Sequence, residues 1–272
     1  MLKRTITGAF VISTVYLVLY FSYIPEVILM ATSLLCVFAV YEIYHAAGIS
    51  GNEVLFTLSI VTATLVVFWE TPYYIEYITA FFILTFVTFT LLMLLQKQTK
   101  LNSSIITPYL TALVVLLICS VPKLRRCDNG IYYLSGAITL GFITDIAAYL
   151  FGRAFGKHKL APTISPNKTV EGSIAGILFG VLSLLIIAVC LDATDVLRFN
   201  YAELCIYATL TSVVGEFGDL AMSSIKRICK VKDFGNILPG HGGILDRFDS
   251  QIFAVPFTLI FCNITGGFIL SA

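Results

Sequence analysis

Charged residues are scarce in this chain of 272 residues. Lys, Arg, Asp and Glu together make up 12% of it, whereas hydrophobic residues make up 58%. A soluble domain of this size carries about twice that charged fraction, so the sequence lacks the polar surface that a water-soluble globule needs. The formal net charge is only +1, which argues against a broadly basic nucleic-acid binder. These two shortages predict a protein whose main solvent is lipid.

Several common metal and nucleotide motifs are also missing. The seven cysteines include no CxxC pair, and most lie in apolar runs, where Cys behaves as a small hydrophobe. We therefore expect neither a disulfide framework nor a zinc site. There is no GxGxxG fingerprint, and "GRAFGKHK" lacks the spacing and the Ser or Thr of a Walker A loop. No cleavage site follows the apolar run after "MLKR", so we expect a first membrane span there.

Long apolar runs are the main feature that is present. A membrane-spanning helix needs about 20 predominantly apolar residues, and the runs lack the alternation of a β-barrel. We therefore predict an all-α, polytopic integral membrane protein that forms a single domain over residues 1–272. About nine transmembrane helices are expected, at 5–23, 25–46, 53–70, 75–95, 105–122, 131–151, 172–191, 202–222 and 251–271.

The distribution of Lys and Arg predicts the orientation in the membrane. With the N-terminus in the cytosol, 13 of the 17 basic residues fall on the cytosolic side, where such residues accumulate. The cluster at 123–126 and Arg198 fall on the opposite side, and the cluster leaves open whether a span near residue 110 is miscounted. We expect a multi-pass protein of the inner or plasma membrane. Its two long polar loops, 152–171 and 223–250, would then face the cytosol.

Acidic residues near or inside apolar runs are the first candidates for a site. Asp145 lies in such a run, Glu216 and Asp219 are three residues apart on one helix face, and Asp246 and Asp249 repeat that spacing. Ionised groups at membrane depth are costly and usually face a cavity with a partner. Structural ion pairs are the alternative, at least as good for Glu216. Carboxylate oxygens without clustered His or thiolate favour Mg²⁺, for which Asp219 and Asp246 would suffice.

Basic residues follow the run that contains Asp219. Lys230 is explained by positive-inside anchoring alone, whereas Lys226, Arg227 and Lys232 are interleaved with acids. That interleaving favours a site for phosphate and metal, because Arg grips phosphate through two hydrogen bonds and Lys acts as a point charge.

Glycines make the same segment, "KDFGNILPGHGGILDRFD" at 232–249, easy to bend. Backbone N–H groups at such turns form anion-binding nests, and a flexible hinge is the alternative. In the other polar loop, Ser165 and Pro166 predict a helix start that places Lys168 near N–H groups attractive to phosphate. His158 has no acidic neighbour of note in the sequence and is expected to be an interfacial residue.

The sequence resembles a known family. The stretch "SSIKRICKVKDFGNILPGHGGILDRFDS" at 223–250 fills, without a gap, the signature of the phosphatidate cytidylyltransferases, also called CDP-diacylglycerol synthases. The region "TDIAAYLFGRAFGKHKLAPTISPNKTVEGSIAG" from residue 144 and the "LKRTITG" start are also similar to that family. The strong resemblance begins at about residue 144, which places the catalytic site in 131–272 and leaves the spans of 1–130 largely lipid-facing.

The resemblance implies an enzyme that joins CTP to phosphatidic acid, giving CDP-diacylglycerol and pyrophosphate. It implies Mg²⁺, with a second cation left open, and it implies a site at the bilayer's cytosolic edge; a homodimer is left open. A CTP-dependent lipid kinase or other lipid phosphotransferase is the alternative, and a transporter is a weaker one because no internal symmetry is found.

The resemblance also assigns roles to residues. Asp219 and Asp246 become metal ligands and, with Lys226 and Arg227, catalytic residues. His241 is expected to position its loop or donate to phosphate, because the attacking phosphate, with a second pKa of about 6, needs no general base. The other substrate-binding residues are Ser165, Lys168, Lys232, Asp233, Arg247, Asp249, Asp145 and Glu171.

The charge bias generates a prediction about topology. In a cysteine-free background, cysteines placed at Lys157 and Lys230 should react with a membrane-impermeant reagent only after the cytosolic face is opened, because both lie in loops assigned to the cytosol. Mass-tag labelling of intact and opened cells measures this, and labelling from outside intact cells would reverse the orientation.

Overall fold

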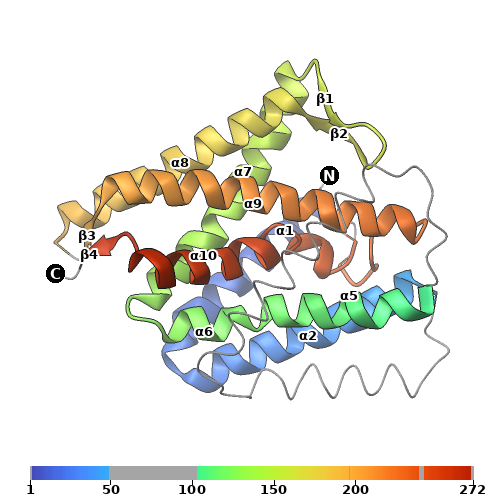
Figure 1. Ribbon diagram of the computed structural model, residues 1–272, viewed down its shortest axis with the longest axis horizontal. Helices are drawn as coiled ribbons and strands as arrows, with labels where there is room; N and C mark the ends of the chain where they lie inside the picture. Colours follow the sequence, from blue (N-terminus) through green and yellow to red (C-terminus); the bar gives the residue numbers. More distant parts are fainter. Residues whose placement is uncertain (1, 49–102, 196, 239–241, 271–272) are drawn as a thin grey trace. The chain divides into compact units, whose positions relative to one another are not determined.

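The computed structural model describes residues 2–48, 103–195, 197–238 and 242–270 (Figure 1). Helices dominate these residues, as the sequence predicts, although four short strands correct a strictly all-α description. The helices are α1 (Leu2–Tyr20), α2 (Pro25–Ala46), α5 (Ser103–Ile118), α6 (Ser120–Arg126), α7 (Gly130–Phe155), α8 (Val170–Ala193), α9 (Tyr201–Ile228) and α10 (Gln251–Thr265), with 3₁₀ turns η1 (Phe21–Tyr23) and η2 (Leu245–Arg247). The strands are β1 (Lys159–Ala161), β2 (Ser165–Thr169), β3 (Arg198–Phe199) and β4 (Ile269–Leu270).

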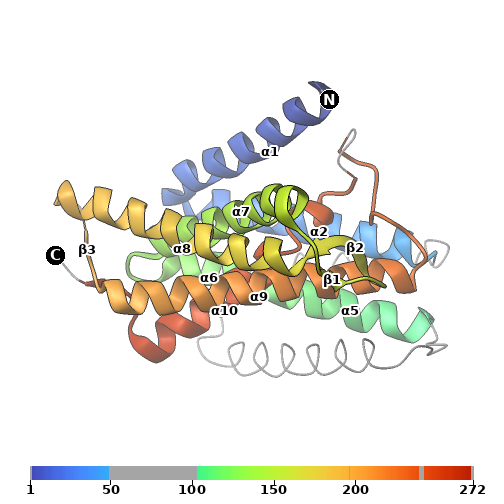
Figure 2. The ribbon, with the colours of Figure 1, turned by 90° about the horizontal axis from the view of Figure 1, so that it is seen from above.

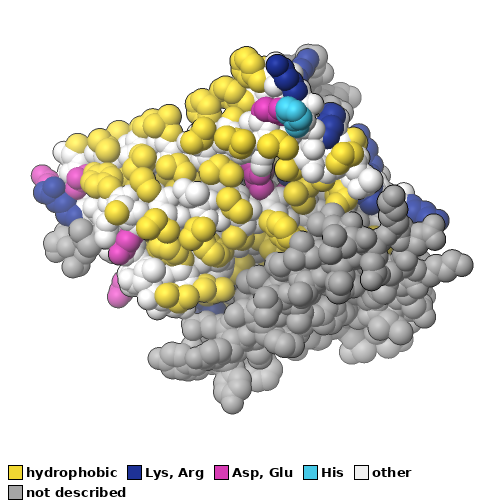
Figure 3. Space-filling view, turned by 45° about the horizontal axis from the view of Figure 1, so that its top comes forward, with side chains coloured by type: hydrophobic (Ala, Val, Ile, Leu, Met, Phe, Trp, Pro, Cys, Tyr) yellow, Lys and Arg dark blue, Asp and Glu magenta, His cyan; other side chains and the backbone are white. Residues whose placement is uncertain are grey.

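Four of these helices are long and apolar enough to cross a membrane: α2, α7, α8 and α9. They confirm long apolar helices at four of the predicted places, 25–46, 131–151, 172–191 and 202–222. The predicted spans at 53–70 and 75–95 lie outside the described residues. The basic cluster at 123–126 belongs to the short helix α6, which is separate from α5. Hydrophobic side chains predominate on the face shown in Figure 3, with Lys and Arg near its margins.

Contacts divide the chain into two compact parts. The first comprises Met1–Lys123 and Ser224–Asp249, and the second comprises Leu124–Ser223 and Ser250–Ala272. In the first part α2 packs against α5, and both helices carry buried side chains, among them Cys36, Val40, Leu113 and Val114. Helix α9 contributes its first 23 residues to the second part and its last five to the first. The residues of the family signature are therefore shared between the two parts.

The second part is built on the close packing of α7 against α8, which run side by side in Figures 1 and 2. Glycines on α8 make this approach possible. A Cβ added at Gly172 would lie 2.5 Å from the carbonyl oxygen of Ala148, and one at Gly176 would lie 2.8 Å from that of Thr144. Small residues let membrane helices approach closely where lipid supplies no hydrophobic drive for association.

The polar loop between α7 and α8 folds as a β-hairpin, so the predicted helix start at Ser165 is wrong. Ser165 pairs with Ala161 in the antiparallel β1–β2 ladder, and the helix begins only at Val170. The N-cap is Thr169, whose hydroxyl accepts the N–H of Gly172 at 3.2 Å. A capping hydroxyl at this place ends the strand and starts the helix, which leaves Lys168 on β2.

The last helix is shorter than the predicted span at 251–271. Helix α10 ends at Thr265, because Gly266 and Gly267 take left-handed backbone angles that turn the chain. The chain then forms β4, which pairs with β3, and the hydroxyl of Tyr133 accepts the N–H of Ile269 at 3.1 Å. Backbone pairing in this segment thus replaces the final turns of helix.

The α7–α8 contact generates a stability prediction. Gly172→Ala should lower the free energy of unfolding by about 1–3 kcal/mol, because the methyl group meets backbone atoms that cannot rotate away. Gly136→Ala on α7 is the matched control, since the nearest atom to its Cβ is a Leu184 methyl at 3.9 Å. Thermal unfolding in detergent measures both variants, and equal stability of the two would contradict the packing argument.

Candidate functional site

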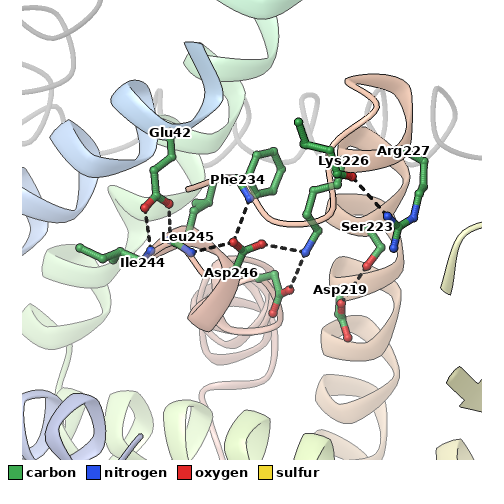
Figure 4. A network of polar contacts seen from close by, with 12 residues as sticks. Glu42, Asp219, Ser223, Lys226, Arg227, Phe234, Ile244, Leu245 and Asp246 are labelled. Atoms are coloured by element: carbon green, nitrogen blue, oxygen red, sulfur yellow. Dashed lines mark hydrogen bonds and ion pairs between the residues drawn. The ribbon is translucent and has the colours of Figure 1, made fainter. Parts of the chain in front are cut away.

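Asp246 organises the glycine-rich loop from inside it. Its Oδ2 accepts the backbone N–H groups of Phe234 and Gly243, each at 2.9 Å, and its Oδ1 accepts a hydrogen bond from Lys226 Nζ, also at 2.9 Å (Figure 4). The side chain is only 1% exposed. The carboxylate therefore joins three points of the segment, which lie 3, 12 and 20 positions before it.

Lys226 is the buried cation of the same group. Its Nζ lies 2.9 Å from Asp246, 3.7 Å from Asp249, and 5.5 Å from the centre of the Phe234 ring. Two carboxylates and an aromatic face compensate an ammonium group whose side chain is 9% exposed. The sequence predicted Lys226, Asp246 and Asp249 as site residues, and the structure brings them together.

Glu42 of α2 completes this group, which we call the loop site: Glu42, Lys226, Asp246 and Asp249. The two carboxylate oxygens of Glu42 accept the N–H groups of Ile244 and Leu245, each at 2.8 Å, as Figure 4 shows. Glu42 is fully buried. Sequence reasoning missed it, although an acid within an apolar run is the signal that identified Asp145.

The backbone amides of the loop form a nest, as predicted, but its occupant differs. Three successive N–H groups, at Gly243, Ile244 and Leu245, all donate to the protein's own carboxylates. An arrangement of this kind binds anions. Here Asp246 and Glu42 are the anions, so these three amides support the loop itself.

The second part of the chain holds another charged group, which we call the helix site: Lys168, Asp219, Glu216 and Asp145. Lys168 of β2 forms an ion pair with Asp219 of α9, with Nζ and Oδ2 2.5 Å apart. Ser223, one turn further along α9, donates to Asp219 Oδ1 at 3.2 Å. The ion pair is partly exposed, which distinguishes it from the buried pair of the loop site.

The other acids of the helix site are held by serines. Ser250 donates to Asp145 at 2.8 Å, and Ser173 of α8 donates to Glu216 Oε2. The other oxygen of Glu216 is buried and has no hydrogen-bond partner among the described residues. The hydrogen-bond donor to Glu216 is thus the neutral hydroxyl of Ser173, where a structural ion pair was considered from the sequence.

Glu171 closes the β-hairpin beside α8. It accepts the N–H groups of Lys157 and His158, and its Oε1 lies 2.6 Å from His158 Nδ1. The expectation that His158 has no acidic neighbour is therefore wrong, because the hairpin brings together residues 13 positions apart. Glu171 contacts the start of the hairpin, and Lys168 contacts Asp219 from its end.

The remaining predicted residues are more peripheral. Arg227 donates to the carbonyl of Val231 at 3.2 Å, which closes the end of α9. Lys232 and Asp233 are exposed, and the side chain of Asp233 lies beside Gly242, whose φ of +84° is left-handed. The Nε of Arg247 is buried and has no hydrogen-bond partner among the described residues. His241 lies outside the described residues.

Mg²⁺ prefers oxygen ligands, and the carboxylates of the loop site and the helix site could supply them. Among the described residues, no group of three or more His, Cys, Asp or Glu side chains could hold a metal ion. Mg²⁺ commonly takes only one or two carboxylates and completes its shell with water and phosphate. Asp219 is partly exposed and suits that role. Asp246 already accepts three hydrogen bonds, which leaves about one of its four lone-pair positions.

Long apolar helices that carry paired charges are typical of an integral membrane protein. The model of the cytidylyltransferase family matches residues 2–265. The chain therefore belongs to the cytidylyltransferase family.

Curated relatives match about half of this chain. The chain is similar to the phosphatidate cytidylyltransferase of Staphylococcus epidermidis, with 48% identity over 129 residues that cover 47% of this chain and 48% of that protein. It is also similar to the phosphatidate cytidylyltransferase of Bacillus subtilis, with 46% identity over 136 residues, 50% of this chain and 49% of that protein. The match thus spans about half the length of each relative.

The buried ion pair of the loop site generates a prediction. Lys226→Met should lower the free energy of unfolding by about 3 kcal/mol, because it leaves Asp246 as an uncompensated buried charge. Lys232→Met removes the same charge from an exposed position of the same loop and should change stability by less than about 0.5 kcal/mol. Unfolding titrations in detergent compare them, and a Lys226→Met variant as stable as the control would contradict this account.

Proposed function

We propose that the protein transfers CMP from CTP to phosphatidic acid, releasing CDP-diacylglycerol and pyrophosphate. The observation that carries the proposal is the loop site: Lys226, Asp246 and Asp249, three positions of the gap-free family signature, meet around one buried ammonium group. The family match and the names of the relatives support the same activity.

The reaction makes demands that these residues suit. An oxygen of the lipid phosphate attacks the α-phosphorus of CTP, a new P–O bond forms, and the bond to the β-phosphate breaks so that pyrophosphate leaves. Negative charge concentrates during this step and must be neutralised by fixed cations. Arg247 supports such a role, because its buried Nε has no protein acceptor among the described residues. We assign phosphate binding to Lys168, Lys226, Arg227, Lys232 and Arg247.

The remaining assignments follow from the sequence. Asp145, Glu171 and Asp249 position the substrates or the basic side chains, and Ser165, Asp233 and His241 contribute to substrate binding. The site faces the cytosol, where CTP is present, while the acyl chains stay in the bilayer. The apolar helices support the membrane location, and the 13 basic residues of the cytosolic segments support the side.

Mg²⁺ is the cofactor we propose, with Asp219 and Asp246 as its carboxylate ligands. When bound, the ion would neutralise phosphate charge and orient the leaving group. The chain's own contribution is the oxygen ligands, and their type supports Mg²⁺ over softer metals. Asp219 and Lys226 are seven residues apart on the continuous helix α9 and so lie on one face of it. Helix α9 thus carries both an acid and a base that we assign to the site.

Labelled CTP tests the activity directly. Purified protein with phosphatidate and Mg²⁺ should move label from α-labelled CTP into a chloroform-soluble liponucleotide, and it should leave the label of γ-labelled CTP in pyrophosphate. Lipid-bound label from γ-labelled CTP would identify a kinase instead. Absence of both products in folded, wild-type protein would reject the proposal.

The metal assignment predicts a large effect at Asp219. Asp219→Asn keeps the size of the side chain but removes the charge that a hard cation needs, so turnover should fall on the order of 10²-fold. Asp195→Asn, at a side chain that is 79% exposed beside Arg198, is the matched control and should keep wild-type turnover. Steady-state rates over a Mg²⁺ titration measure both, and near-normal turnover of Asp219→Asn at saturating Mg²⁺ would exclude Asp219 as an essential ligand.

A further inference from the structure

Glu42 makes a connection that the signature does not include. It lies in α2, about 200 residues before the glycine-rich loop, and both oxygens of its buried carboxylate accept hydrogen bonds from the backbone of that loop. Each oxygen accepts one N–H, from Ile244 and from Leu245, at 2.8 Å. Charge-assisted hydrogen bonds of this kind are among the strongest in proteins. A buried acid with such contacts fixes the position of the backbone that it binds.

Two glycines of the loop are shaped around this carboxylate. A Cβ added at Gly243 would lie 2.4 Å from Glu42 Oε2, and one added at Gly235 would lie 2.7 Å from Oε1. Neither glycine has a positive φ, so backbone strain does not explain why glycine stands there. The three atoms nearest to each added Cβ all belong to Glu42. The loop and the side chain therefore fit one another closely from both sides.

The turn held by Glu42 carries the residues that we assign to catalysis. Ile244 and Leu245 lead directly into η2, which contains Asp246 and Arg247. Asp246 holds the other end of the turn through Phe234 and Gly243. Two carboxylates thus accept hydrogen bonds from neighbouring amides. Asp246 lies within the loop, and Glu42 lies on α2.

We propose that Glu42 is a positioning residue, whose carboxylate clamps the turn at 243–245 to α2 and thereby sets Asp246 and Arg247 for reaction with substrate. The catalytic half of this inference rests on the proposed function, whereas the clamp itself does not. Misplacement of reacting groups by about 1 Å costs on the order of 10²-fold in rate. Glu42 acts on the substrate only through the loop.

Hydrogen exchange tests the clamp without any need for activity. In Glu42→Gln one acceptor becomes an N–H donor that faces a backbone N–H, so amides in a peptide covering 242–249 should exchange about tenfold faster or more. Glu26→Gln makes the same chemical change at an exposed position in the first turn of α2 and should exchange like the wild type. Equal exchange in the two variants would overturn the proposal.

Kinetics test the consequence for catalysis. Glu42→Gln should lower kcat on the order of 10²-fold and raise KM for CTP on the order of tenfold, because Arg247 loses its alignment with phosphate. Loss of folded protein lowers the apparent kcat but does not change KM, so the rise in KM separates positioning from simple instability. Faster exchange with unchanged kcat and KM would overturn the catalytic role. An inactive wild type would reject the proposed function, and hydrogen exchange would still decide the clamp.

A double-mutant cycle tests the close fit between Glu42 and Gly243. Gly243→Ala should speed exchange in the wild-type background, since the methyl group must displace the carboxylate from its two hydrogen bonds. In a Glu42→Ala background the same change should have little further effect, because the obstructing atoms are gone. Coupled effects of this kind identify residues in contact. Additive effects of the two substitutions would overturn the proposed contact.

Discussion

The loop site depends on one interaction, the acceptance of backbone N–H groups by buried carboxylates. A glycine-rich loop beside membrane helices has amides that neither helix nor sheet satisfies, and an unpaired amide in such a place is costly. Asp246 and Glu42 supply the missing acceptors for Phe234 and for the three amides at 243–245. Lys226 in turn compensates the charge that this solution places in the interior. These hydrogen bonds hold the loop at Phe234 and at 243–245, where the number of glycines suggests a hinge.

The second part of the chain also keeps charged groups among apolar helices. Helices α7 and α8 pack closely across Gly172 and Gly176, and several polar side chains of this part are joined in pairs. Lys168 meets Asp219, and serines meet Asp145 and Glu216. Pairing lowers the free-energy cost of keeping acids at membrane depth.

The sequence predicted best what depends on local patterns. Apolar runs located α2, α7, α8 and α9, and the family signature located Lys226, Asp246 and Asp249. The loop between α7 and α8 was predicted less well. Ser165 was assigned to a helix start, although the helix is capped by Thr169. The β-hairpin that brings His158 to Glu171 shows no hydrophobic periodicity that could have predicted it. Glu42 escaped because its partners are backbone atoms in a distant segment, which leave no trace in side-chain spacing. The single domain and its division near residue 130 stay predictions.

The distance along the chain between Glu42 and its partners also bears on the order of assembly. The strand pairing of the hairpin between α7 and α8 and its contacts with Glu171 join residues at most 14 positions apart, so these contacts can form as soon as both helices have entered the membrane. Glu42 must wait for residues 202 and 203 positions later. Contacts between distant segments form late, because the intervening chain must first be ordered. During synthesis, α2 therefore enters the bilayer with an acid whose partners do not yet exist, and the loop takes its final shape among the last steps of folding.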